Sequence, residues 1–187
     1  MSPSIAALLK TARILWFALF ASPAFFIAVL ALQASRQVQR VDFEMSPQTQ
    51  AVLYAALSVA IATTSVVLPH RQLLMSIRRL NLRVEDQVGE QVGSFRESAP
   101  VRRVVADPEA AVRAAMPSFQ STFIVGMALA EAVALFGLLF GYVGNPPLWC
   151  APFFIVCWAL MASKFPRVTQ ITGAIEAATG AECRLGS

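Results

Sequence analysis

The chain alternates between long apolar stretches and shorter polar ones. Four stretches contain no Lys or Arg before their ends: Ile14 to Leu32, Ala51 to Leu68, Phe123 to Val143, and Leu148 to Ser163. A helix rises about 1.5 Å per residue, so the roughly 30 Å hydrocarbon core of a bilayer needs about 20 residues. Because these runs are apolar on every face, they predict transmembrane helices and not the alternating strands of a barrel.

The predicted fold is therefore all-α, a polytopic membrane protein with four transmembrane helices in two hairpins. The first run is expected to be retained, because it is longer than the roughly 7 to 15 apolar residues of a signal peptide. The predicted divisions are a first transmembrane hairpin over 1–69 (helices about 14–32 and 51–68), a cytoplasmic segment over 70–120, a second transmembrane hairpin over 121–166 (helices about 122–143 and 148–165), and a cytoplasmic tail over 167–187.

Composition agrees with a bilayer as the solvent. Apolar residues make up 57% of the chain and charged residues 14%, with a mean hydropathy of +0.61, whereas soluble domains carry about 25% charged residues. If four helices alternate in direction, only Arg36 and Arg40 among the basic residues fall on the outer side. The positive-inside rule then places both termini in the cytoplasm. The expected location is the cell inner membrane, which the chain crosses several times.

The net charge of +4 follows from this topology. The expected partners are the bilayer and its anionic headgroups, together with further copies of the chain or other membrane subunits, and no nucleic acid.

An amphipathic cytoplasmic helix is predicted between the second and third transmembrane helices, over Arg71 to Val88. The apolar residues recur at helical steps of four, three, four and four: Leu73, Ile77, Leu80, Val84 and Val88. Basic residues on the other faces are the headgroup candidates: Arg71, Arg78, Arg79 and Arg83. Two interpretations stay open. The helix extends the second transmembrane helix and packs on its neighbours, or it lies on anionic headgroups.

Asp107 should begin the helix that follows, with Pro108 at its first position and Glu109 near its positive end. The chain's few cysteines and its single histidine form no ligand set for a metal, so no metal or cofactor is expected. Neither a Ser/His/Asp set, nor paired carboxylates, nor a phosphate-binding glycine loop is present. The sequence therefore indicates a protein that is not an enzyme.

Glu131 is the only ionisable residue inside any of the four runs, and it falls near the middle of the third. An acidic residue at the centre of a transmembrane helix costs about 2.5 to 3.5 kcal/mol on insertion scales, which makes it a candidate functional group. Beside it runs a stripe of small residues at steps of four, four, three and four: Gly126, Ala130, Ala134, Gly137 and Gly141. Such a stripe allows close packing of another helix. Candidate partners for the carboxyl are the hydroxyls of the other runs: Ser22, Tyr54, Ser58, Thr63, Thr64 and Ser65.

Residues 127 to 142, with the pattern Leu-Ala-Glu-Ala-x-Ala-x-x-Gly, resemble the carboxylate-bearing helix of the rotor-ring c subunit, the proteolipid of F-type and V-type ATPases. The resemblance implies that Glu131 binds a proton or a cation. It covers about one helix of the four. The run from Ala51 to Leu68 contains no glycine, whereas the corresponding helix of that family is glycine-rich.

Two hypotheses for the function follow. In the first, a non-enzymatic integral membrane protein assembles through the small-residue stripe, with Glu131 as a buried protonatable group that donates a hydrogen bond between helices. In the alternative, Glu131 binds or translocates a proton or a cation, in a way similar to the c subunit.

Overall fold

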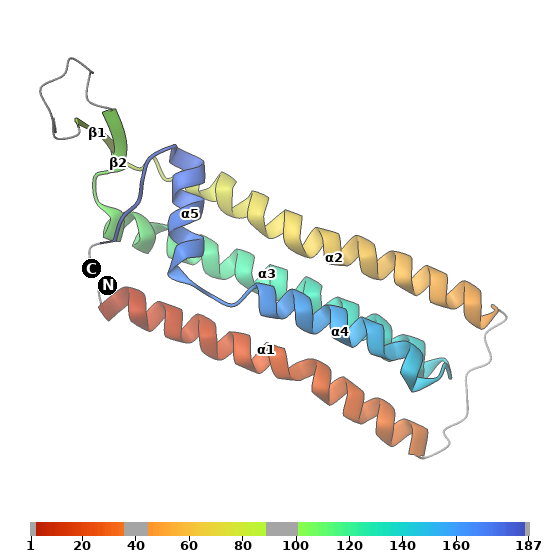
Figure 1. The fold of residues 1–187 in the computed structure, drawn as a ribbon. Helices are drawn as coiled ribbons and strands as arrows, with labels where there is room; N and C mark the ends of the chain where they lie inside the picture. The colour runs from red at the N-terminus through yellow and green to blue at the C-terminus, as the bar shows by residue number, and fades with distance from the viewer. Residues whose placement is uncertain (1–2, 36–44, 89–100, 186–187) are drawn as a thin grey trace, which may run out of the picture. The chain divides into compact units, whose positions relative to one another are not determined.

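The structure, a computed structural model, describes residues 3–35, 45–88 and 101–185. Within these ranges the chain is predominantly helical, as the sequence predicts (Figure 1). The elements in chain order are α1 (Pro3–Ser35), α2 (Pro47–Arg78), β1 (Val84–Val88), β2 (Val101–Val105), α3 (Pro108–Tyr142), α4 (Pro147–Ser163) and α5 (Val168–Thr179). Arg36 and Arg40, the two basic residues expected on the outer side, lie outside the described residues.

Three of the described helices are long and apolar enough to cross a membrane. The spans lie in Ile5–Gln33, Pro47–Arg78 and Pro108–Tyr142. The remaining apolar helix, α4, has 17 residues and is shorter than the others. These helices indicate a membrane-spanning protein.

The chain divides into two compact units. One, here called the apolar four-helix unit, consists of Arg13–Pro69 and Phe123–Phe165. The other, here called the mixed unit, consists of Met1–Ala12, His70–Thr122 and Pro166–Ser187. Each unit contains its own hydrophobic core.

In the apolar four-helix unit, segments of α1, α2, α3 and α4 pack around a core of α3 and α4 side chains. Met127, Val133 and Ala134 of α3 are fully buried, as are Cys157 and Met161 of α4. The outer surface is also apolar. Phe25 is 68% exposed, Val52 70% and Leu148 80%, as expected where hydrocarbon and not water surrounds the helices.

The mixed unit corrects the predicted amphipathic helix over 71–88. The helical part ends at Arg78, the end of α2, and Val84–Val88 forms strand β1, which pairs with β2 in antiparallel register from Val84↔Val105 to Val88↔Val101. Asn81, with a φ of 45°, lies in the left-handed region and turns the chain between the helix and the strand. The prediction was wrong for 79–88 because apolar residues four apart also fall on one face of a strand.

Leu73 and Ile77 are buried in the core of the mixed unit, against Val112 and Met116 of α3 and Ile175 of α5. The apolar stripe of this part of α2 therefore packs on protein. That observation agrees with one of the two interpretations left open, an extension of the second helix.

The start of α3 agrees with its predicted cap, since the Asp107 Oδ1 accepts a hydrogen bond from the Ala110 N–H at 2.8 Å. Near the C-terminus, the Val105 N–H donates to the Glu182 carbonyl at 3.0 Å and holds the tail beside β2. Burial raises the pKa of the adjacent Cys183 thiol, and the Glu176 carboxylate raises it further. Cys183 thus stays neutral at physiological pH and packs as an apolar residue.

Candidate functional site

Glu131 lies at the border between the buried and the exposed sides of α3. Met127 and Ala134, four residues before it and three after it, are fully buried. Ala128 and Leu135 on its other side are exposed, and the Glu131 side chain itself is partly buried. The sequence predicted a position flanking the stripe of small residues, and the structure places Glu131 beside the stripe in this way.

The carboxyl of Glu131 has no hydrogen bond or ion pair to any other residue that the structure describes. The Cys157 thiol of α4 lies within electrostatic range of it. Two of the candidate hydroxyls donate within their own helix instead: Thr63 to the Val59 carbonyl and Thr64 to the Ala60 carbonyl, each at 2.8 Å. An acidic group in the middle of an apolar helix is thus left without a hydrogen-bond or ion-pair partner among the described residues.

The stripe of small residues is filled by helices of the same chain. Gly126, Ala130, Ala134 and Gly137 are buried and Gly141 is partly buried. A Cβ built on Gly126 would meet Pro69 of α2 at 3.2 Å, one on Gly137 would meet the Phe153 Cβ of α4 at 2.7 Å, and one on Gly141 would meet Leu30 of α1 at 2.6 Å. The glycines therefore bring α3 close to α1, α2 and α4.

A lysine bonds a backbone carbonyl that a proline leaves without its donor. Pro69 lies inside α2 and has no N–H, so the carbonyl of Ser65, four residues earlier, loses its usual helical partner. The Lys164 Nζ, just beyond the end of α4, donates to this carbonyl at 2.6 Å. Gly126 leaves room for the contact, since a Cβ there would lie 3.4 Å from the Nζ.

Tryptophans make similar contacts between α1 and α4. The Trp158 Nε1 of α4 donates to the carbonyl of Phe20 in α1 at 3.1 Å, three residues before Pro23. In return, the Trp16 Nε1 of α1 donates to the Met161 carbonyl at 2.8 Å. Sequence reasoning missed the roles of Lys164 and of both tryptophans. For Lys164 a signal was visible, since Pro69 lies inside an apolar run and leaves a carbonyl that needs another donor.

A polar contact also lies at the other end of the unit, next to the turn between α3 and α4. The buried Asn145 Nδ2 donates to the Gln50 Oε1 of α2 at 3.2 Å and to the Phe140 carbonyl at 3.0 Å. Gln50 in turn donates to the Met45 carbonyl at 3.2 Å. These amides satisfy one another and fix the ends of α2 and α3 together.

The headgroup candidates are Arg71, Arg78, Arg79 and Arg83, and all four are exposed on the mixed unit. They are available to headgroups, and that contact stays a prediction. No group of three His, Cys, Asp or Glu residues able to hold a metal ion occurs in the described part of the chain.

Comparison with protein-family models, with curated proteins and with solved structures finds no match to this chain.

Proposed function

We propose that this chain is a non-enzymatic integral membrane protein that crosses the bilayer four times, with both termini in the cytoplasm. In this proposal Glu131 is a protonatable group through which α3 meets a helix of another molecule. The fourth crossing is α4, whose 17 residues correspond to about 26 Å of helix, near the lower limit for a span.

The observation that carries the role of Glu131 is the lack of an internal partner at a half-covered position. A carboxyl inside hydrocarbon favours its neutral form and needs a hydrogen-bond partner. Because the stripe of small residues is occupied by the chain's own helices, the partner has to approach from the exposed side of α3, beside Leu135. A second copy of the chain or another membrane subunit could supply it.

The alternative is that Glu131 takes up and releases a proton or a cation. The partly buried position of Glu131 favours this alternative, because a proton or a cation can reach a group at the edge of the unit without opening the core. The resemblance of residues 127 to 142 to the c subunit points the same way.

Substitution at Glu131 tests the proposal. Glu131→Gln keeps the shape and a hydrogen-bond donor, so the association constant of the protein in detergent should stay within about twofold of the wild type. Glu131→Leu removes the hydrogen bond, which contributes about 1 to 2 kcal/mol between membrane helices, and should weaken association about tenfold. Glu109→Gln, at the start of α3, is the matched control and should leave the association constant unchanged.

Association can be measured by analytical ultracentrifugation in density-matched detergent. Unchanged association of the Glu131→Leu protein would rule out an interface at this residue. Labelling of Glu131 by a carbodiimide that depends on pH and is blocked by a cation would instead support the ion-binding alternative. In that alternative Glu131→Gln abolishes function and leaves assembly intact.

Topology is a separate prediction that follows from the distribution of basic residues. Reporter fusions after Ser94 and after Ser187 should both read cytoplasmic, and a fusion after Asp42 should read on the opposite side. A non-cytoplasmic result at Ser94 would contradict the four-span arrangement.

A further inference from the structure

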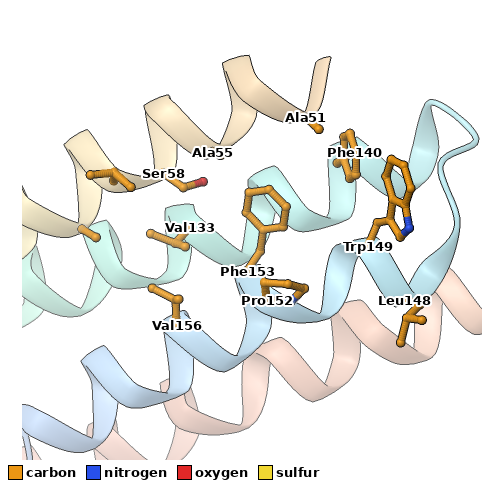
Figure 2. Close-up of a pocket in the computed structure, with 12 residues that line it drawn as sticks. Ala51, Ala55, Ser58, Val133, Phe140, Leu148, Trp149, Pro152, Phe153 and Val156 are labelled. Carbon is orange, nitrogen blue, oxygen red and sulfur yellow. The ribbon is translucent and has the colours of Figure 1, made fainter. Parts of the chain in front are cut away.

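An apolar groove of about 500 Å³ lies inside the apolar four-helix unit, between α2, α3 and α4 (Figure 2). Its volume is within the range of about 300 to 1,000 Å³ that is usual for small-molecule sites. The floor contains Val133 of α3, which is buried, while Val59 and Leu148 at the rim are exposed. The groove thus has a closed base and an accessible edge.

Two unlike walls face each other across the groove. The α2 wall is made of small residues at steps of four, three and four: Ala51, Ala55, Ser58 and Ala62. The opposite side carries aromatic rings, Phe140 from α3 with Trp149 and Phe153 from α4, and Figure 2 shows Phe153 projecting from α4 toward α2. A flat wall opposite aromatic rings suits a planar ring, which can stack on them.

Ser58 carries the one hydroxyl among the lining residues, and this hydroxyl is unpaired among the described residues. The residue is 7% exposed, and its Oγ is buried with no hydrogen-bond partner among the described residues. Ser65 on the same helix bonds the Ala62 carbonyl at 2.8 Å, as the two neighbouring threonines bond theirs. A buried unpaired hydroxyl is costly, and an acceptor on a bound molecule would remove that cost.

We propose that this groove binds a lipid-soluble molecule with a planar ring, a carbonyl oxygen on the ring and an apolar tail, which is the chemistry of a lipid-soluble quinone. The carbonyl accepts a hydrogen bond from Ser58 once the hydroxyl turns about χ1 from its buried position toward the groove, and the ring lies between the α2 wall and the aromatic wall. Ser58 lies about 10 Å along α2 from Ala51, at the outer end of the apolar run. Ser58 therefore lies deeper in the bilayer than the ester carbonyls of lipids. A ring carbonyl inside the hydrocarbon reaches the Ser58 hydroxyl better than a lipid ester does.

Two other occupants explain the groove less well. An acyl chain carries no polar atom for Ser58 at this depth, and it would lose rotational freedom between fixed walls. A helix of a second copy is about 10 to 12 Å across with its side chains, so it would cover the rim without filling the base. The proposal is independent of Glu131, which does not line the groove.

The test uses the whole chain in detergent with decylubiquinone as the probe. Binding is measured by quenching of tryptophan fluorescence and by the rise in melting temperature. The wild type should bind the quinone and should bind decylbenzene, which lacks the carbonyl, more weakly. Ser58→Ala should weaken quinone binding about fivefold, the effect of one neutral hydrogen bond, and should leave decylbenzene binding unchanged. Ala55→Phe should fill the groove and abolish binding of both.

Ser22→Ala is the matched control. The Ser22 Oγ of α1 is also buried with no hydrogen-bond partner among the residues that the structure describes, but it lies outside the groove. It should not change quinone binding. Equal binding of both compounds with no effect of Ser58→Ala would overturn the proposal and leave a site for alkyl chains only. A disulfide cross-link between the Val59→Cys residues of two copies, formed at the expense of quinone binding, would overturn the proposal in favour of a second copy as the occupant. Failure of the wild-type protein to bind the quinone would also overturn the proposal.

Discussion

Gly137→Ala is expected to destabilise the apolar four-helix unit by about 1 to 3 kcal/mol, the usual cost of overpacking a core. A Cβ at this position would lie 2.7 Å from the Phe153 Cβ and 3.4 Å from the Cys150 carbonyl oxygen, both on α4. A Cβ is fixed to its own backbone, so the clash can be relieved only by moving α3 away from α4.

Two other glycines provide graded controls. At Gly141 the closest atom would be the Cδ2 at the end of the Leu30 side chain, which can change rotamer, so Gly141→Ala should cost less than Gly137→Ala. Gly173 of α5 has nothing within 4 Å of the built Cβ, and Gly173→Ala should stabilise the protein by about 0.5 to 1 kcal/mol through its helix propensity.

Thermal unfolding in detergent measures all three variants, with an expected shift of about 2 to 4 °C per kcal/mol for a chain of this size. Gly137→Ala with a melting temperature equal to that of Gly141→Ala would show that α3 and α4 are not in close contact at Gly137.

Lys164→Met is expected to destabilise the apolar four-helix unit by about 1 to 3 kcal/mol. The methionine keeps the length of the side chain but cannot donate to the Ser65 carbonyl, which Pro69 has already deprived of its helical donor. Lys10→Met removes the same charge from an exposed position of α1 and should leave the melting temperature within about 1 °C, as for most surface substitutions.

A double-mutant cycle with Pro69→Ala isolates the mechanism. Alanine at 69 supplies an N–H to the Ser65 carbonyl within α2, so Lys164→Met should cost little in the Pro69→Ala background. We expect a coupling energy of about 1 kcal/mol or more between the two positions, measured by thermal unfolding of the four proteins. Additive effects of the two substitutions would show that Lys164 stabilises the unit by some means other than this carbonyl.

The local pattern of the sequence determined the four apolar helices, α1 to α4, and the start of α3, whereas α5 lies in the segment that was predicted only as a tail. The apolar runs predict α1 to α4 because the lipid requires a long apolar sequence in each span, whichever helices pack beside it. Asp107 determines the start of α3 through a hydrogen bond only three residues away. The position of Glu131 beside the stripe of small residues also follows from helical period alone.

Pairing between distant segments was decided only by the tertiary structure. The helical period of the apolar residues continues past Arg78, yet Val84–Val88 is a strand because Val101–Val105 is available to pair with it. Opposite charges on the two segments were the overlooked signal, since Asp86 of β1 lies opposite Arg103 of β2. Such pairing depends on which segments meet, and a local period does not record it.

The same reason explains the contacts of Lys164 and Ser58. Lys164 bonds a carbonyl that lies 99 positions away in the sequence, and Ser58 lines a groove formed by three helices. A lysine at the end of an apolar run and a serine within one each have an ordinary local explanation, as a headgroup contact and as a hydroxyl bonded to its own helix. The packing of α2, α3 and α4 against one another gives each side chain a different environment, because it fixes which backbone and side-chain atoms lie opposite.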